Sequence, residues 1–211
     1  LRTRNLLRAP WWLCDFVVIA LLASCAPARD YRGIIHCHTK YSHDSTGTYE
    51  EILAAAKAAK VDFVIITDHP PDDDPGRPLR EGWRGMRDGV LFIQGAELRH
   101  NLLAIGICEP IRARDREAMI AEIRAQGGLA FIAHPEEVKD WPKDIDGMEI
   151  YNVHAAFKRA MPKRLPELMK LLKEDPDHLF LPLAELDPGI LERRRALGIP
   201  GIAGNDAHRN V

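Results

Sequence analysis

The sequence predicts an α/β fold built on parallel strands, with a functional site at the carboxyl ends of those strands. Four apolar runs, each long enough for a buried strand, end in a histidine or a carboxylate: residues 63–69, 90–97, 129–134 and 199–208. Surface histidines would not fall repeatedly at the ends of buried strands, whereas parallel α/β barrels place their active sites there. With 211 residues, 46% of them hydrophobic, the chain can bury one sizeable core, so we expect one folded domain.

The first expected strand, residues 31–35, leads directly into His36 and His38. Side chains alternate between the faces of a strand, so these two imidazoles share one face and Cys37 points to the other. Two imidazoles on one face make half of a metal site, and His43 follows five residues later. A lone histidine is usually structural, but this grouping favours a metal site.

The segments that follow alternate between helix and strand. Thr48 to Glu51 has the form of a capping box and begins an alanine-rich helix that runs through Lys60. The strand at 63–69 completes a strand–helix–strand unit, which indicates a right-handed parallel connection. The alternation continues, with strands expected at residues 90–97, 102–107, 129–134, 147–152 and 199–208, and helices at residues 115–126, 165–173 and 188–197.

Residues 70–89 form the least regular stretch, rich in proline, aspartate and arginine. In one interpretation it is a loop at the mouth of the site, from which Arg77 binds a phosphate with its forked guanidinium. A solvated charged loop explains the same composition equally well. The three successive aspartates lack the glycine and distal glutamate of a calcium-binding loop, so we do not expect calcium there.

Six short motifs together resemble the PHP family, named for polymerase and histidinol phosphatase. They occur in the order typical of that family between His36 and His208: HCHTKYSHD, TDH, GAEL, AHP, EIYN and GNDAH. Each motif alone is weak, but six in order are specific. The resemblance implies a distorted (β/α)7 barrel, truncated at its C-terminus if the chain is a fragment, that holds two or three divalent ions and hydrolyses phosphate esters.

The resemblance also implies the metal ligands. They fall into three sets: His36, His38, Glu97 and Asp206; Glu97 again with His100 and His134; and His43, His69 and His208. Asn101 competes with His100 for its place, and we choose His100 because imidazole is the better ligand. Histidines combined with carboxylates suit Zn, Mn or Fe, and the sequence does not distinguish between these metals.

Further polar residues near the motifs are candidates for supporting roles. Asp44 could orient a ligand histidine, and Lys40 could contact a phosphate. Asn152 could orient a phosphate or a bound water. His154 could act as an acid or support a ligand, although a surface loop residue explains it equally well. Adjacent ions would ionise a bridging water and stabilise the charge of the phosphoryl group, so no protein nucleophile is needed.

The expected function is therefore hydrolysis of a small phosphate monoester or a nucleotide. A net charge of −2 gives no basic field that would attract nucleic acid, which disfavours the alternative of an exonuclease acting on nucleic-acid ends. A non-catalytic metal-binding lipoprotein is the other alternative. The sequence predicts no protein partner.

The N-terminal residues 1–25 indicate an export signal. Three arginines precede an apolar run that is short for a membrane span and contains Asp15. The ending Leu22–Cys25 resembles a bacterial lipobox, which implies cleavage before Cys25 and a lipid on its sulfur. Residues 26–31 would then be a tether to a domain at 32–211. The alternative is an uncleaved anchor.

The chain begins with leucine and ends directly after a motif, so we expect the natural protein to be longer. If the lipobox is functional, the protein is anchored on the periplasmic or extracellular face of a bacterial membrane. Palmitate labelling of the expressed protein should then be lost in Cys25→Ala, and processing should be sensitive to globomycin. An unlabelled, soluble product would refute this localisation.

Overall fold

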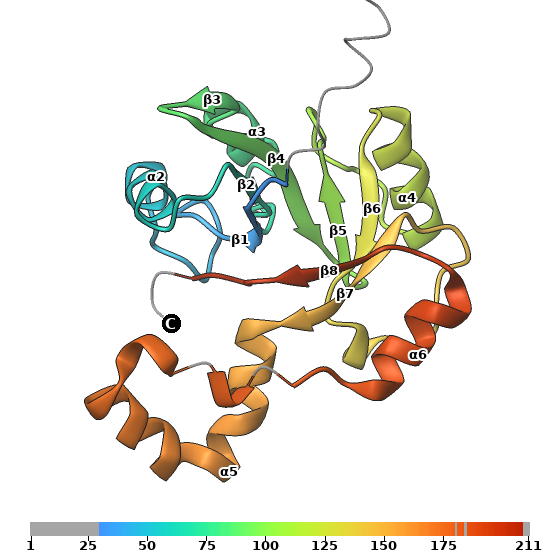
Figure 1. The fold of residues 1–211 in the computed structure, drawn as a ribbon. Coiled ribbons are helices and arrows are strands. Elements are labelled where there is room, and N and C mark those ends of the chain that lie inside the picture. The colour runs from blue at the N-terminus through green and yellow to red at the C-terminus, as the bar shows by residue number, and fades with distance from the viewer. Residues whose placement is uncertain (1–29, 180, 184, 209–211) are drawn as a thin grey trace, which may run out of the picture. The chain divides into compact units, whose positions relative to one another are not determined.

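The computed structural model describes residues 30–179, 181–183 and 185–208 (Figure 1). The expected export signal and Cys25 lie outside these residues, as does the C-terminal Val211. Residues 32–211 form one compact unit. A membrane-spanning helix is not found among the described residues, because every helix there is too short or too polar.

In the described part of the chain, eight strands form one sheet: β1 (Gly33–Cys37), β2 (Phe63–Ile66), β3 (Gly85–Arg87), β4 (Val90–Leu98), β5 (Leu102–Ile105), β6 (Leu129–Ile132), β7 (Gly147–Asn152) and β8 (Gly201–Gly204). Seven of them follow the order β1-β2-β4-β5-β6-β7-β8, and β3 pairs with β4 outside this path. The pairs β1–β2, β2–β4, β6–β7 and β7–β8 are parallel.

The sheet is nearly closed into a barrel because the segment after β8 returns to β1 (Figure 1). A parallel bridge joins Cys37 to Ala207. The backbone amides of Asn205 and Ala207 donate to the carbonyls of Ile35 and His36 at 2.9 and 3.2 Å, and the amide of His38 donates to Ala207 at 3.0 Å. The first and last sequence motifs are therefore held side by side by the backbone, and the predicted barrel class is confirmed.

Two strands depart from the parallel arrangement that we expected. β3 is antiparallel to β4. β5 is antiparallel to both β4 and β6. The turn between β4 and β5 contains only residues 99–101, and a parallel pair needs a crossover of a dozen or more residues. His100 and Asn101 both adopt the left-handed conformation that closes this tight turn, with φ of 65° and 57°.

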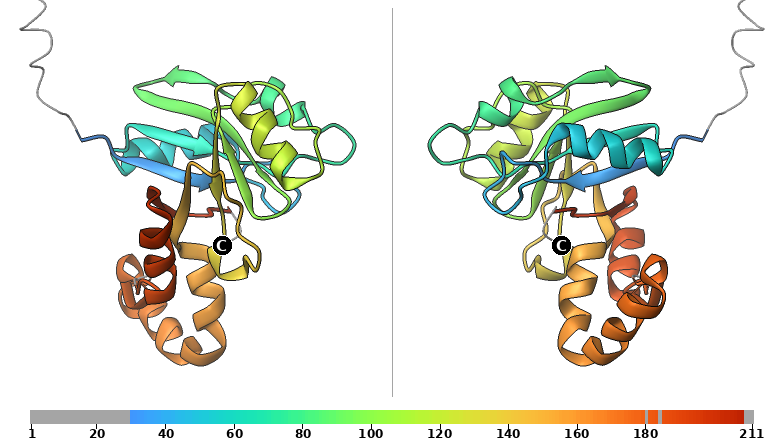
Figure 2. Two further views of the ribbon diagram at one scale, coloured as in Figure 1. Left: turned by 90° about the vertical axis from the view of Figure 1, so that its right-hand side faces the viewer. Right: turned by 90° about the vertical axis from the view of Figure 1, so that its left-hand side faces the viewer.

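The helices are α2 (Tyr49–Ala58), α3 (Arg77–Glu81), α4 (Arg116–Ala125), α5 (Val153–Glu174) and α6 (Pro188–Leu197), with short 3-10 turns η1 (Pro135–Glu137), η2 (Pro176–His178) and η3 (Leu181–Leu183). The predicted capping box of α2 is present, since Thr48 and Glu51 bond reciprocally. The helix expected at 165–173 begins much earlier: α5 spans 22 residues and contains Pro162 and Pro166. Figure 2 shows α5, the turns after it and α6 lying together on one side of the sheet.

Alternation along the strands separates the core into an interior and two outer layers. Ile65 and Leu103 belong to the cluster inside the barrel. Val64 and Ile66, on the opposite face of β2, pack against α2, whereas Leu102 of β5 packs with apolar residues of α4. The apolar side chains fill the middle of the barrel, and polar side chains lie beyond them at the carboxyl ends of the strands.

A bulge at the end of β1 brings both histidines of the first motif into the barrel. The register shifts between Ile34 and Cys37, and His36 has a φ of 64°. Ile35 packs in the interior and so does its neighbour His36, whereas Cys37 packs in the layer against α2. His36 and His38 therefore share a face, as predicted, but the route is a bulge rather than regular alternation.

Candidate metal centre

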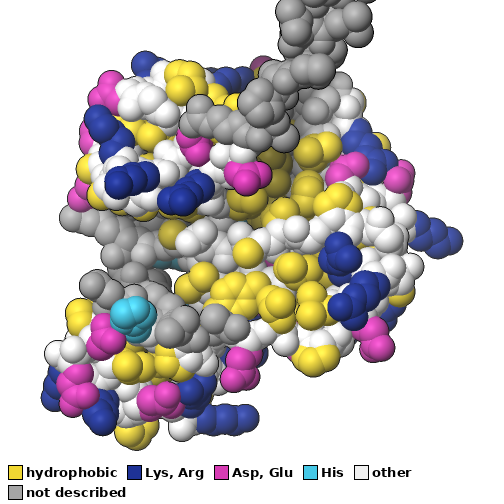
Figure 3. Space-filling model, viewed as in Figure 1, with side chains coloured by type: hydrophobic (Ala, Val, Ile, Leu, Met, Phe, Trp, Pro, Cys, Tyr) yellow, Lys and Arg dark blue, Asp and Glu magenta, His cyan; other side chains and the backbone are white. Residues whose placement is uncertain are grey.

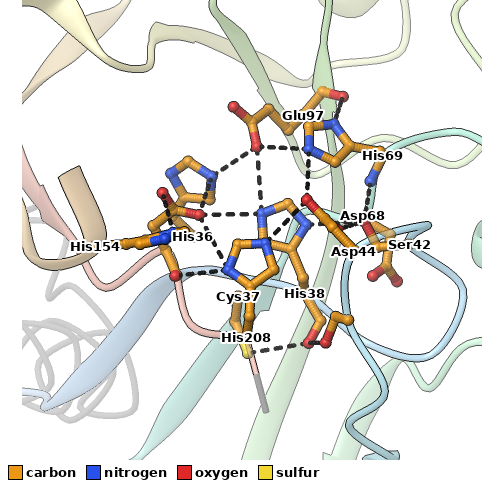
Figure 4. Close-up of polar contacts among 12 residues, drawn as sticks. His36, Cys37, His38, Ser42, Asp44, Asp68, His69, Glu97, His154 and His208 are labelled. Atoms are coloured by element: carbon orange, nitrogen blue, oxygen red, sulfur yellow. Dashed lines mark hydrogen bonds and ion pairs between the residues drawn. The ribbon is translucent and has the colours of Figure 1, made fainter. Parts of the chain in front are cut away.

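Nine polar side chains converge at the carboxyl ends of the parallel strands (Figure 4). They come from segments far apart in the sequence: His36, His38, Asp44, His69, Glu97, His134, His154, Asp206 and His208. His36 and His38 are almost fully buried, and Glu97, Asp206 and His208 are buried as well. The strand-end histidines that the sequence singled out do meet at one place.

Glu97 lies at the centre of this group. Its Oε2 is 2.9 Å from His36 Nε2, 3.2 Å from His38 Nε2 and 3.4 Å from His69 Nε2. Its Oε1 is 3.3 Å from His134 Nε2. Asp206 supplies a second carboxylate, with Oδ1 3.4 Å from both His36 Nε2 and His38 Nε2.

Four of the histidines are oriented in the same way. In each, Nδ1 is bound to a neighbouring side chain or backbone carbonyl, and Nε2 faces the carboxylates. The Nδ1 partners are Glu149 Oε1 for His36 (2.7 Å), Ser42 Oγ for His38 (3.1 Å), the Glu97 carbonyl for His69 (3.3 Å) and the Asp206 carbonyl for His208 (3.0 Å). Metal-binding histidines in proteins are held in this manner.

The hydrogen bonds of Glu149 and Ser42 determine which nitrogen carries the proton in two of these rings. A carboxylate only accepts, so His36 Nδ1 carries the proton it donates to Glu149. The one hydroxyl proton of Ser42 goes to Asp44 Oδ1 at 2.8 Å, so Ser42 accepts from His38 Nδ1 and from the amide of His69. In both histidines Nε2 is thereby turned toward the centre.

The donor set fits divalent ions. The ligand atoms of His36, His38, Glu97 and Asp206 all lie within 4.8 Å of one another, as do those of two further groups: His38, Asp44 and His208, and His154, Asp206 and His208. Two ligands of one tetrahedral Zn²⁺ lie about 3.4 Å apart, close to the separations seen here. The Nε2 atoms of His38 and His208 are buried, and their contacts within 3.2 Å are to carboxylate oxygens of Glu97 and Asp44.

Three buried carboxylates, Glu97, Glu149 and Asp206, shift the pKa values of the histidines beside them. Burial lowers the pKa of His36, but hydrogen bonds to Glu149 and Glu97 outweigh it and raise that pKa to about 10. Burial acts similarly on His38, and bonds to Asp206 and Glu97 raise its pKa to about 9. Burial raises the pKa of Glu97, but bonds from His134, His36 and His38 hold it well below its usual range. Protonated imidazoles thus balance the carboxylate charge in the metal-free protein.

The structure brings Asp44, and not His43, within ion-pair distance of the other ligand candidates. Asp44 Oδ2 is 3.1 Å from His208 Nε2 and 3.4 Å from His69 Nε2. The side chain of His43 is exposed, and its ring lies 5.0 Å from the ring of His69. Asp44 therefore occupies the position that we had expected His43 to take, and it is itself a ligand candidate rather than only a support.

His100 and Asn101 are engaged elsewhere. His100 is exposed and its Nε2 donates to the carbonyl of Arg114 at 3.1 Å, while Asn101 donates to Glu137 at 3.2 Å. The tight turn between β4 and β5 positions both side chains for these contacts. Of the second ligand set, the structure brings together only Glu97 and His134.

The other predicted residues are placed as follows. Asn152 is buried, donates to Glu149 at 3.2 Å and caps α5 by accepting from the amide of Ala155 at 2.8 Å. Lys40 lies over the ring of Tyr41, and Arg77 pairs with Asp73 at 3.6 Å. His154 Nδ1 is 3.4 Å from Asp206 Oδ2, and burial lowers the pKa of this imidazole.

Sequence reasoning missed Glu149 and Ser42. Glu149 is fully buried and also accepts from the amide of His134 at 3.0 Å. A side chain at Gly204 would collide with Glu149 Oε1, so this position of β8 accommodates only glycine. Glu149 begins the EIYN motif, and alternation along β7 could have placed it on the inner face.

Two cavities open beside the centre. The first, of about 410 Å³, lies over the carboxylates and is lined in part by His134, His154, Lys158 and Arg159. The second, of about 770 Å³, shares His69 and Glu97 with the first.

The model of the PHP domain matches residues 35–164 of the chain. The chain belongs to the PHP domain family. Proteins named "Probable phosphatase" from Yersinia pestis (strain Pestoides F) and Yersinia enterocolitica are each 31% identical over 139 residues, which cover 53% of this chain and 56% of the relative. The chain thus spans about half the length of the curated relatives it matches.

A solved structure with a similar arrangement is that of a "putative metal-dependent phosphoesterase" from Bifidobacterium adolescentis. The TM-score is 0.49 at 14% sequence identity, over 86% of this chain and 89% of the other.

Metal binding to this PHP domain should release protons. At about pH 7.5, His36 and His38 carry protons that an ion must displace from Nε2. Affinity for Zn²⁺ should therefore rise with pH, and calorimetry in buffers of different ionisation enthalpy should detect about two protons released. In the metal-free protein, the stability from these raised pKa values is present below 6.5 and is lost as pH rises through about 9 to 10. An observed binding enthalpy that does not depend on the buffer would contradict this.

Substitutions at the adjacent residues His43 and Asp44 should show which of the two binds the ion. We expect Asp44→Asn to weaken binding of one ion by at least about 10-fold, because it removes the carboxylate that faces His69 and His208. His43→Asn should leave the metal content unchanged. Metal analysis after dialysis against a weak chelator measures both. Loss of an ion from His43→Asn, with none lost from Asp44→Asn, would restore the ligand set predicted from sequence.

Proposed function

We propose that this PHP domain is a metal-dependent phosphoesterase that hydrolyses small phosphate monoesters with two or three divalent ions, Zn, Mn or Fe. The observation that carries the proposal is the shared orientation of four histidines, with Nδ1 held by the protein and Nε2 turned toward Glu97 or Asp44. Family membership and the names of the Yersinia relatives support the same reaction class.

The chain offers two adjacent places for ions. His36, His38, Glu97 and Asp206 would hold one ion, and Asp44 with His208 and His69 would hold another. Glu97 lies within 3.4 Å of His69 as well as of His36, so its carboxylate is placed to serve both. Ions bound there would polarise a phosphoryl oxygen and help to ionise water.

The remaining residues of the first cavity are suited to binding and orienting the phosphate. Lys158 and Arg159 project from the first turns of α5 into its lining. Arg159 pairs with Glu136 at 2.8 Å, whereas Lys158 has no ion-pair partner among the described residues. Lys158 therefore replaces Lys40 and Arg77 as the candidate for a phosphate contact. His154, half-buried in the same wall, is placed to exchange a proton with a bound substrate.

Two alternatives are less well supported. An exonuclease would need an extended basic field for a nucleic-acid strand, and the net charge of −2 does not supply one. On the face drawn in Figure 3, lysine and arginine are interspersed with acidic side chains around a hydrophobic band. A metal store would not require a carboxylate shared between adjacent sites. Export as a lipoprotein remains our proposal for where the enzyme works.

Glu97→Gln tests the reaction class. It should lower metal-dependent release of phosphate by at least about 100-fold, because Glu97 loses the charge that faces four imidazoles. Glu192→Gln, at an exposed position of α6, is the matched control. Metal content and phosphate release are measured together on both variants. Bound ions without turnover on any phosphate ester would favour the metal-binding alternative, and a protein that binds no ion would refute the site itself.

A further inference from the structure

The second cavity extends the site away from the phosphate-binding region. It is the larger of the two, at about 770 Å³, and it meets the first at His69 and Glu97. A substrate whose phosphoryl group lies against the metal ligands can therefore place its ester group in the second cavity. The walls of that cavity then determine which alcohol is accepted.

Three arginines line this cavity: Arg99, Arg112 and Arg114. None has an ion-pair partner among the described residues. Elsewhere in that part of the chain six of the twelve arginines pair with a carboxylate: Arg77, Arg80, Arg116, Arg124, Arg159 and Arg164. All three side chains are exposed, so a bound anion could approach guanidinium groups that no carboxylate of the described residues neutralises.

The segment that carries two of these arginines is held by its backbone. Glu122 of α4 accepts from the amide of Arg112 at 3.1 and 3.0 Å and from that of Ala113 at 2.9 Å. His100 donates to the carbonyl of Arg114 at 3.1 Å. Because Glu122 is occupied by amides, the guanidinium groups are left for a ligand, and the segment needs no reordering to bind one.

The rest of the lining is suited to an organic group. Pro70 and Pro71 form part of one wall, and Ile111 and the buried Met119 form part of another. Two carboxylates are present: Glu97 faces the imidazoles of the centre, and Asp72 is exposed. An apolar wall beside three cations fits an organic group that carries its own negative charge.

We propose that the second cavity binds an anionic group, a phosphate or a carboxylate, on the alcohol portion of the substrate. The preferred substrates would then be phosphate monoesters that carry a second anion. Hydrolysis consumes one water and yields inorganic phosphate and an alcohol that keeps this anion. His100 is a positioning residue for Arg114 in this arrangement. The hydrolysis step of this inference rests on the proposed phosphoesterase function. The binding of the anion in the second cavity does not depend on it.

Binding of unreactive phosphonates tests the cavity directly. Methylphosphonate is compared with α,ω-alkanebisphosphonates whose spacers have roughly two to six methylene groups, by calorimetry on the metal-loaded protein. At one or more spacer lengths the bisphosphonate should bind at least about 10-fold more tightly than methylphosphonate. This preference should disappear in the double variant Arg112→Gln/Arg114→Gln and persist in Arg195→Gln, at an exposed position of α6.

Kinetics gives the second measurement. With 3-carboxypropyl phosphate the double variant should raise KM and change kcat little, and with butyl phosphate it should change neither. Equal binding of mono- and bisphosphonates at every spacer length, or a preference that survives in the double variant, would overturn the proposal. If arginine-dependent binding is found but no ester is hydrolysed, the anion site stands and the phosphoesterase function fails.

Discussion

Glu97 is a buried carboxylate, and the structure around it is organised to supply the positive charge it needs. A buried carboxylate without a partner would cost several kcal/mol, so it must face protons or ions. Four imidazoles face it, and three of the four are oriented by a hydrogen bond at Nδ1: His36 to Glu149, His38 to Ser42 and His69 to the backbone carbonyl of Glu97. The barrel determines which residues can reach Glu97, and hydrogen bonds at Nδ1 determine which ring atom each presents.

The same centre depends on unusual backbone conformations. His36, His134 and Asp206 each lie at the end of a strand with positive φ, at 64°, 45° and 51°. Left-handed conformations of non-glycine residues cost about 1 kcal/mol or more each, and they persist only where the surrounding structure enforces them. Here the pairing of the strands fixes the backbone before each of these residues, and contacts among the converging polar side chains fix their side chains. The strained backbone at these three positions therefore directs three ligand candidates toward the same point at the carboxyl ends of the strands.

The sequence predicted the barrel, its strand ends and most of the converging side chains, because buried strands and histidines at their ends are local patterns. It could not distinguish His43 from Asp44, since only the loop bonded through Ser42 decides which of two neighbours turns inward. The family resemblance placed His100 in the centre, but the tight turn before the antiparallel β5 directs this side chain to the carbonyl of Arg114 instead. Glu149 escaped notice because its role lies in a contact with His36, 113 residues away.

The closure of the barrel has a consequence for how the protein acquires its shape. The segment after β8 pairs with β1, so this seam joins residues about 170 positions apart and carries a large loop-closure entropy. We expect contacts of such separation to form late in folding, because their loop-closure entropy is offset only once the strands and helices between them have assembled. His36 and Asp206 stand on the two sides of the seam. An ion that binds both residues would therefore link β1 to the segment after β8. By mass action it would stabilise the closed barrel relative to a form in which the last strand has separated.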